Sequence, residues 1–321
     1  MNEFELIERY FQQKPHRSDV MLEIGHDATL LKPPTNELIA NTIDTLIENI
    51  HFFPETGPFD LGYKSLAVNL SDLSAIGAKP AWYFLALTMP KADPFWLEEF
   101  SRGLFNLAQT YDMDLVGGDT TRGPLVITIQ AQGFIPPDLA HTRRGAKPGD
   151  LIYVTGSLGD AALGLSIAKK GGLDPLNDAQ KFLLTRYHRP TPQVAAGIAL
   201  RGIASSAIDI SDGLAADLSH ILTMSQVGAT IYLKNLPLSQ AFDQIATTQE
   251  KYPLALTGGD DYELCFTVPS QKESELKTAM ASINCPYQQI GRIEKTPGLH
   301  ILDENNQPIT LTKTGYLHFN L

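Results

Sequence analysis

The stretch Val116-Gly117-Gly118-Asp119-Thr120-Thr121-Arg122-Gly123 lies between an amphipathic helical run and a segment of alternating apolar and polar residues. Two adjacent glycines permit positive φ angles and a close approach of a ligand to the main chain, so we expect a glycine turn with one carboxylate at its tip. Such a carboxylate faces either solvent, as in an ordinary polar turn, or a bound metal or phosphate. Similar acidic elements recur along the chain and favour the second interpretation.

The composition limits the class of protein. The chain has 321 residues, of which 43% are hydrophobic and 19% charged, as is typical of a globular protein of two domains. No apolar run approaches the roughly 20 residues that span a bilayer, and Met1 to His16 is not a basic, apolar signal peptide. We therefore expect a cytoplasmic protein with no membrane partner. Cys265 and Cys285 lack the spacing of a metal site or a disulfide framework and are interpreted as core thiols.

The charge limits the class of ligand. A net charge of -11 opposes nucleic-acid phosphates, and no basic run offsets it. We expect no nucleic-acid partner, and a bound nucleotide would be held through metal ions.

Hydrophobic periodicity predicts the elements of the first half. Asp93 and Pro94 read as the N-cap and first residue of a helix. The segment 57–65 resembles a Walker phosphate loop, but Tyr63 interrupts its Gly-Lys step, so we interpret it as the approach to a helix. The expected elements are helix 2–12, strand 39–45, helix 61–76, strand 82–89, helix 94–111 and strand 125–134.

Proline and glycine clusters at 136–137 and 145–150 indicate a boundary, so we predict domains 1–137 and 138–321. The second half begins with a strand at 151–155 and a strand-to-helix turn at 156–164. That turn either cradles a phosphate at a helix N-terminus or serves tight helix packing. Further expected elements are helix 176–188, a strand from Ser206 with Asp212 opening the next helix, and a strand at 255–256.

Candidate site residues follow from these elements. Strand alternation aims Thr42 and Asp44 to one side, which describes either a hard-oxygen cation site or a polar strand end. Asp72 lies on a helix, facing solvent or a site. His51 is either a ligand or a packed core histidine, and Arg143 either grips a phosphate or is a solvated linker charge.

Two acidic patterns recur at similar spacing. Asn69 to Asp72 resembles Asp209 to Asp212, and the Gly-Gly-Asp segments follow 47 residues after Asp72 and 48 after Asp212. This suggests that the halves derive from one unit or converge on one site chemistry, with chance as the rival explanation. The hypothesis requires the paired aspartates to occupy equivalent places in the two halves.

Together these motifs resemble the thiamine-monophosphate kinase family, within the superfamily of ATP enzymes related to aminoimidazole ribonucleotide synthetase. The resemblance covers essentially the whole chain. The motifs that carry it are Gly25-His26-Asp27, Asp44-Thr45-Leu46, Asn69-Leu70-Ser71-Asp72, Gly117-Gly118-Asp119-Thr120, Asp209-Ile210-Ser211-Asp212-Gly213-Leu214 and Gly258-Gly259-Asp260-Asp261-Tyr262-Glu263-Leu264.

The resemblance implies an α/β fold with mixed sheets. The fold consists of an N-terminal domain whose sheet pairs across a homodimer and a C-terminal domain that completes an ATP cleft.

The resemblance also implies roles for individual site residues. The magnesium ligands would be Asp27, Thr42, Asp44, Asp72, Asp119, Asp209 and Asp212; ATP would contact Gly118, Asp119, Arg143 and Ser211; thiamine monophosphate would contact His51, Asp260 and Tyr316. The family usually has Glu where this chain has Asp260, and Tyr316 lies in only a short terminal motif, Gly315 to Phe319.

The implied activity is ATP-dependent phosphorylation of thiamine monophosphate to thiamine diphosphate, with several magnesium ions and no catalytic side chain acting as a general base. Two carboxylates 6 Å apart repel by about 3 kcal/mol at an effective dielectric constant near 20, so several converging aspartates require cations. The alternatives are a sibling synthetase of the superfamily and a non-catalytic nucleotide or metal sensor.

Overall fold

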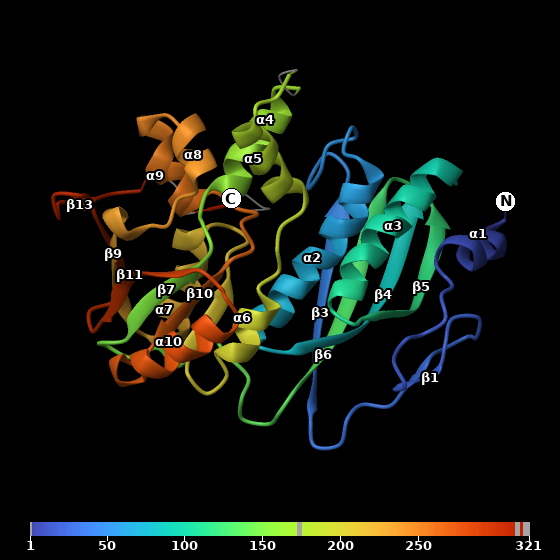
Figure 1. Cartoon of the computed structure of the whole chain (residues 1–321), viewed down its shortest axis with the longest axis horizontal. Coiled ribbons are helices and arrows are strands. Elements are labelled where there is room, and N and C mark those ends of the chain that lie inside the picture. Colours follow the sequence, from blue (N-terminus) through green and yellow to red (C-terminus); the bar gives the residue numbers. More distant parts are fainter. Residues whose placement is uncertain (1, 172–174, 312–314, 317–321) are drawn as a thin grey trace. The chain divides into compact units, whose positions relative to one another are not determined.

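The computed structural model describes residues 2–171, 175–311, 315 and 316 (Figure 1). It contains two compact units. The first comprises Met1–Leu73 and Ala78–Asp138, and the second comprises Ser74–Gly77 and Leu139–Leu321. Within the described ranges, every helix is too short or too polar to traverse a lipid bilayer.

The first unit has a four-stranded sheet with helices on one face and a separate two-stranded sheet. Its elements are α1 (Glu3–Tyr10), β1 (Val20–Leu22), β2 (Leu30–Leu31), β3 (Leu38–Ile47), α2 (Pro58–Ile76), β4 (Lys79–Met89), α3 (Pro94–Thr110), β5 (Asp114–Arg122) and β6 (Val126–Ile135). The four long strands have the order β3-β6-β4-β5, and only the pair β4-β5 is parallel. Asp93 accepts hydrogen bonds from the N–H groups of Phe95 and Trp96, which confirms it as the N-cap of α3.

Glycines let the two long helices of this unit approach closely (Figure 1). A Cβ on Gly62 of α2 would lie 2.0 Å from the carbonyl oxygen of Phe100, and one on Gly103 of α3 would lie 2.0 Å from that of Phe59. Any side chain at either position would therefore separate the helices. Gly62 lies inside α2, which begins at Pro58. As expected, this segment is not a phosphate loop, and the helix begins three residues before the predicted start at Leu61.

The glycine turn predicted at Val116–Gly123 is wrong. Residues 114–122 form β5, whose Gly118 is paired with Leu85 of β4. A Cβ on Gly118 would lie 1.9 Å from the carbonyl oxygen of Leu85, so this glycine is required by strand packing. The register shift of the pair between Tyr83 and Phe84 absorbs the irregularity that the glycine pair introduces.

The second unit is built on a seven-stranded sheet. Its strands are β7 (Leu151–Thr155), β8 (Ser206–Asp209), β9 (Gly228–Tyr232), β10 (Leu264–Val268), β11 (Tyr287–Glu294), β12 (Gly298–Leu302) and β13 (Pro308–Ile309), in the order β13-β12-β9-β11-β7-β10-β8. Its helices are α4 (Asp160–Lys169), α5 (Asp178–His188), α6 (Val194–Ala199), α7 (Leu214–Ser225), α8 (Gln240–Ile245), α9 (Thr248–Thr257) and α10 (Glu273–Ser282), with short 3-10 turns η1 (Leu233–Asn235) and η2 (Ser270–Lys272).

Alternation along the central strands places the apolar residues of the two sheet faces in two separate clusters. Ile152 and Val154 of β7 pack in one cluster with Leu218 of α7, and Tyr153 packs in the other with Met280 of α10. Successive strand residues point to opposite faces, so both faces of the sheet are covered. The pair β9-β12 is parallel and the other pairs are antiparallel, which confirms the expected α/β fold with mixed sheets.

Two local predictions in the second unit are wrong. Ala255 and Leu256 lie in helix α9 rather than a strand, because the capping box formed by Thr247 and Glu250 starts a helix that runs through Pro253. Asp212 does not open a helix either. Helix α7 begins at Leu214 after Gly213.

The proposed internal repeat is also wrong. Asn69 to Asp72 lie inside helix α2, whereas Asp209 ends strand β8 and Asp212 lies in the following loop. Asp119 lies in a strand, whereas Asp260 lies in a loop. The paired aspartates occupy unrelated places, so the similar spacing is coincidental.

Candidate active site

Three oxygen-bearing side chains meet on the helix-covered face of the first unit. Thr42 and Asp44 lie two residues apart on β3 and point to the same face, and Thr42 Oγ1 donates a hydrogen bond to Asp72 Oδ2 on α2. Asp44 and Asp72 are also hydrogen bonded. The predicted side-by-side orientation of Thr42 and Asp44 is confirmed, and it extends to Asp72.

The electrostatics of this cluster favour a cation. Burial, together with the charge of Asp72 and the hydrogen bond to it, raises the pKa of Asp44 to about 7. Without a cation the two carboxylates are held together by a shared proton, because both cannot stay ionised at this separation. A hydroxyl and two carboxylates are the hard oxygen donors that magnesium prefers, so these residues fit one ion.

Asp119 lies away from this cluster in the first unit. It is paired with Ala86 on β4, which is paired with Thr128 on β6, which is paired with Thr45 on β3. The hydroxyl oxygens of Thr45 and Thr128 are 2.9 Å apart, so this row of side chains shares one face. That face is opposite to the one that carries Asp44, and three strand spacings separate Asp119 from β3 by about 14 Å.

Two further predicted residues of the first unit lie in loops. Asp27 is exposed in the connection between β1 and β2. His51 follows β3 and accepts the backbone N–H of Ile47 on Nδ1 at 3.0 Å, which assigns the proton to Nε2. His51 is thus a held, half-buried histidine with Nε2 as its donor atom.

In the second unit, a loop between β8 and α7 carries Ser211 and Asp212. The carboxylate of Asp217, in the first turn of α7, accepts the N–H groups of Ser211, Asp212 and Gly213 at 3.0, 3.1 and 3.1 Å. Three successive amides aimed at one oxygen form an anion-binding nest that is filled by the protein itself. Burial raises the pKa of Asp217 to about 7, and the charge of Asp212 adds to the effect.

The same loop is joined to the other predicted residues of the second unit. The N–H of Asp260 donates to the carbonyl of Ser211 at 2.9 Å, and the N–H of Tyr316 donates to the carbonyl of Asp212 at 3.2 Å. Backbone hydrogen bonds therefore bring Ser211, Asp212, Asp260 and Tyr316 together. Tyr316 is half exposed, and residues 317–319 of its motif lie outside the described residues.

Asp209 and Arg143 differ from this group in exposure. Asp209 is buried at the end of β8, paired with Leu264, whereas the side chain of Arg143 is exposed. The backbone carbonyl of Arg143 accepts a hydrogen bond from Ser225 at 3.2 Å, which fixes its main chain and leaves its guanidinium outside the core.

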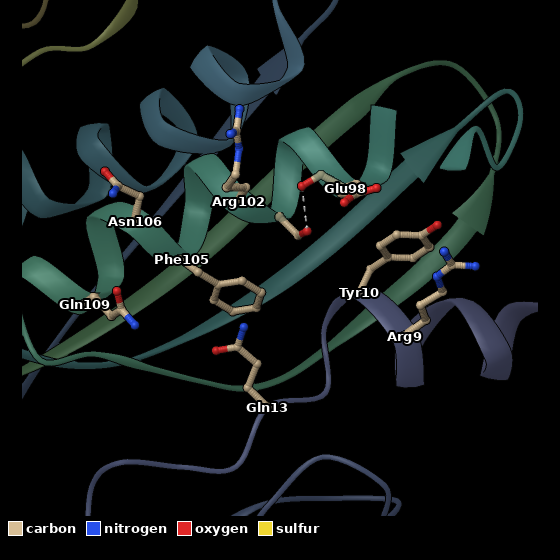
Figure 2. A pocket seen from close by; sticks show the side chains of 9 residues that line it. Arg9, Tyr10, Gln13, Glu98, Arg102, Phe105, Asn106 and Gln109 are labelled. Carbon is tan, nitrogen blue, oxygen red and sulfur yellow. Dashed lines mark hydrogen bonds between the residues drawn. The ribbon is translucent and has the colours of Figure 1, made fainter. Parts of the chain in front are cut away.

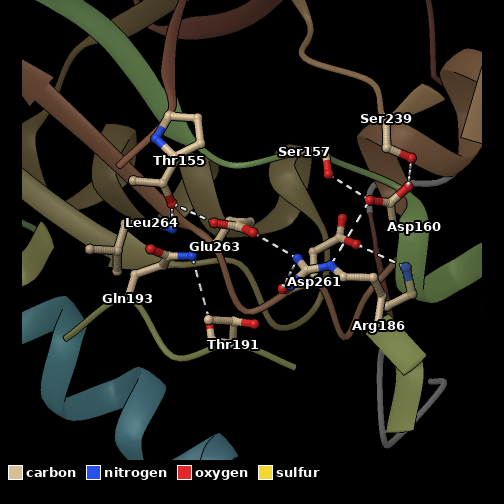
Figure 3. Close-up of polar contacts among 12 residues, drawn as sticks. Thr155, Ser157, Asp160, Arg186, Thr191, Gln193, Ser239, Asp261, Glu263 and Leu264 are labelled. Atoms are coloured by element: carbon tan, nitrogen blue, oxygen red, sulfur yellow. Dashed lines mark hydrogen bonds and ion pairs between the residues drawn. The ribbon is translucent and has the colours of Figure 1, made fainter. Parts of the chain in front are cut away.

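Sequence reasoning missed a buried polar cluster around Asp261 and Glu263 (Figure 3). The Asp261 carboxylate accepts the N–H groups of Gly159 and Ala161 at 2.7 and 3.2 Å. The N–H groups of the turn that begins α4 therefore bind an internal carboxylate. This argues against a phosphate at this helix N-terminus and favours the interpretation as a packing turn. Burial raises the pKa of Asp261 to about 8. Asp261, Tyr262 and Glu263 are all buried, and no periodic pattern in the local sequence indicates it.

A hollow of about 510 Å³ lies elsewhere in the first unit (Figure 2). Arg9 and Tyr10 of α1 face Arg102, Phe105 and other residues of α3 across it. None of the predicted site residues that the structure describes lines this hollow. Across the described ranges there is also no group of three or more His, Cys, Asp or Glu side chains placed to bind a metal ion.

Two family models match the chain: AIR synthase related protein, N-terminal domain, over residues 25–135, and AIR synthase related protein, C-terminal domain, over residues 147–304. A curated thiamine-monophosphate kinase of Escherichia coli (strain K12) is 48% identical over 320 residues, 99% of this chain and 98% of that protein. The thiamine-monophosphate kinase of Bacillus subtilis (strain 168) is 36% identical over 332 residues, 99% of this chain and all of that protein.

Solved structures agree with the sequence relatives. The crystal structure of thiamine-monophosphate kinase from Stenotrophomonas maltophilia K279a is similar with a TM-score of 0.86 and 45% identity, over 89% of this chain and 92% of that one. The structure of AaThiL complexed with AMPPCP and TMP is similar with a TM-score of 0.79 and 27% identity, over 90% of this chain and 89% of that one. The chain belongs to the thiamine-monophosphate kinase family.

Proposed function

We propose that this enzyme transfers the γ-phosphoryl group of ATP to thiamine monophosphate, forming thiamine diphosphate and ADP, the last step of thiamine diphosphate biosynthesis. The observation that carries the proposal is the adjacent pair of carboxylates Asp44 and Asp72, with the hydroxyl of Thr42, in a chain of this family. The relative AaThiL was solved in complex with AMPPCP, an ATP analogue, and TMP, which supports the same two ligands for this chain.

The site residues are assigned unit by unit. In the first unit, Thr42, Asp44 and Asp72 would together hold magnesium. Asp27 and Asp119 are proposed as further ligands, Gly118 and Asp119 as ATP contacts, and His51 as a substrate contact. In the second unit we assign Asp209 and Asp212 to magnesium, Arg143 and Ser211 to ATP, and Asp260 and Tyr316 to thiamine monophosphate. Several magnesium ions, when bound, would neutralise the phosphate charges.

The chemistry needs positioning more than proton transfer. A phosphate oxygen of thiamine monophosphate attacks the γ-phosphorus in line, the bond from that phosphorus to the β–γ bridging oxygen breaks, and ADP leaves. The attacking oxygen is already ionised at neutral pH, so no general base is required. What this chain supplies is orientation: the loop at Ser211 is preformed by Asp217, and the loop at Asp260 is hydrogen bonded to it.

The substrate side requires recognition of a cation. The thiazolium ring of thiamine monophosphate is positively charged, so the carboxylate of Asp260 and the ring of Tyr316 are suitable partners, the tyrosine through a cation–π contact. Asp260 Oδ1 accepts the hydroxyl of Tyr262 at 3.0 Å. Asp260 is shorter by one methylene than the glutamate usual in the family, so its reach depends on where the loop places its backbone.

We also propose a homodimer formed through the sheet of the first unit. The edge strand β3 exposes Leu38, Ile39, Ile43 and Ile47. Ile39, Ile43 and Ile47 share one face of this strand, and exposed apolar residues on an edge strand are normally covered by a partner.

Phosphorus NMR of the protein with magnesium, ATP and thiamine monophosphate tests the function. The proposal predicts thiamine diphosphate and ADP in equal amounts. ADP without thiamine diphosphate would move the substrate assignment to a sibling synthetase, and intact ATP in the presence of bound nucleotide would identify a sensor.

A further inference from the structure

The loop that carries Asp260 has a strained backbone. Asp260 and Tyr262 have φ angles of 68° and 51°, in the left-handed region that residues other than glycine rarely adopt. Such conformations persist only where surrounding contacts hold them. The contacts that hold this loop therefore decide where the carboxylate of Asp260 points.

Arg186 contacts this loop at two residues, Asp261 and Glu263 (Figure 3). Arg186, on α5, donates from Nη2 to the carbonyl oxygen of Asp261 at 3.3 Å and to Oε1 of Glu263 at 2.7 Å. The second oxygen of Glu263 accepts the hydroxyl of Thr155 at 2.7 Å. Both carboxylate oxygens of Glu263 are thus satisfied, and the arginine ties the loop to α5.

The arginine also balances buried negative charge. Its Nε lies 3.9 Å from Oδ2 of Asp160, and Asp160, Asp261 and Glu263 are each almost fully buried. Burial raises the pKa of all three carboxyls, and the charge of Arg186 opposes that rise. Removing the guanidinium would leave buried carboxylates that must take up protons or move towards water.

The space around this cluster is preformed. A Cβ on Gly156 would lie 2.2 Å from Oε1 of Glu263, and Gly156 has a φ of 55°, so glycine is required there for the carboxylate to fit. Asp160 is held by hydroxyl groups of Ser157 and Ser239 at 2.5 and 2.6 Å. Each carboxylate of this network is therefore held in one defined position by its neighbours.

We infer that Arg186 is a positioning residue, which sets the direction of the Asp260 carboxylate towards the substrate by holding the main chain at Asp261 and the side chain at Glu263. This inference rests on the proposed function, because the substrate contact of Asp260 is part of it. The substrate contact depends strongly on the backbone position of the loop, because the short side chain of Asp260 cannot compensate for a displaced backbone.

The test uses Arg186→Gln, with Arg186→Lys as a milder variant in case the first does not fold. Lys181→Gln is the matched control, because Lys181 lies on the same helix in an exposed ion pair with Asp178 at 3.5 Å. We expect Arg186→Gln to raise the KM for thiamine monophosphate about tenfold or more, with the KM for ATP and kcat changed less than about threefold. Arg186→Lys should fall between, and Lys181→Gln should match the parent.

A double-mutant cycle separates positioning from general stability. If Arg186 acts through Asp260, Arg186→Gln should not raise the KM for thiamine monophosphate further in an Asp260→Ala background. Additive effects, or an unchanged KM in a folded Arg186 variant, would overturn the inference.

Amide hydrogen exchange tests the positioning role of Arg186 without an activity assay. The N–H groups of Asp260 and Tyr262 donate to Ser211 and Ile210 at 2.9 and 2.8 Å. They should exchange about tenfold faster or more in the Arg186 variants but not in Lys181→Gln. A parent enzyme inactive on thiamine monophosphate would refute the proposed function, whereas unchanged exchange in the Arg186 variants would refute the positioning role.

Discussion

The hydroxyl of Thr42 on β3 donates a hydrogen bond to the carboxylate of Asp72 on α2, 30 residues further along the chain, and thereby joins a strand to a helix. Asp44 lies two residues after Thr42 on the same face of β3 and is hydrogen bonded to the same carboxylate. The pKa of Asp44 is raised to about 7. A strand and a helix thus hold two acidic groups close together, where only a proton or a cation makes their proximity tolerable.

Thr42→Val should lower kcat about tenfold or more at a fixed magnesium concentration, because it removes a donor to Asp72 and a proposed magnesium ligand while keeping the shape of the side chain. Thr45→Val is the matched control, since Thr45 lies on the opposite face of the same strand and bonds to Thr128. Steady-state kinetics over a magnesium series checks this. Equal effects of the two substitutions would remove Thr42 from the site.

Asp217→Ala should weaken ATP binding about tenfold and lower the free energy of unfolding by about 2 kcal/mol, because it leaves three N–H groups of the loop at Ser211 without their acceptor. Isothermal titration with AMPPCP and denaturant unfolding measure the two effects. Asp217→Asn keeps an acceptor oxygen in place and should bind more tightly than the alanine variant. The exposed Asp243→Asn serves as the surface control, and ATP affinity unchanged in Asp217→Ala would contradict the role.

The stability of the metal-free protein should fall as the pH rises from about 4 to 8, the window between the ordinary and the folded pKa of Asp261. The folded pKa of Asp261, about 8, is above its ordinary value of 3.8, so the folded state binds the extra proton between these values. The stabilisation is therefore present at low pH and is lost as the pH rises through 8.

Asp261→Asn should flatten this part of the pH profile, although it loses one of the hydrogen bonds from Gly159 and Ala161 and so melts lower at pH 6. Melting temperatures across the pH range check the prediction, with the fully exposed Asp178→Asn as control. A variant whose slope equals that of the parent would show that another group titrates.

Ile43→Lys should convert the proposed dimer to a monomer, because Ile43 is 66% exposed on the edge strand β3 and a charge there opposes burial against a second copy. Light scattering coupled to size-exclusion chromatography measures the mass. Met224→Lys places the same charge on an exposed apolar residue of α7 and should leave the mass unchanged. A monomeric parent protein would reject the dimer itself.

Local sequence signals were sufficient to predict the elements in which those signals agree with burial. The N-cap at Asp93, the alternation of Val126–Ile135 and the helical periodicity of α2 follow from side-chain chemistry and spacing, and they appear in the structure as expected. The side-by-side direction of Thr42 and Asp44 also follows, because a strand repeats every two residues. The combination of the six motifs was sufficient to predict the family to which the chain belongs.

Tertiary structure decided the places where local signals conflict. The glycine pair at 117–118 permits a turn, but pairing with β4 makes it a strand, and that register sends Asp119 to the face opposite Asp44. The partners of Asp217, Asp261 and Arg186 likewise depend on which elements meet. A carboxylate is equally acceptable in water or in a satisfied buried site, and only the folded chain supplies the buried donors that distinguish the two.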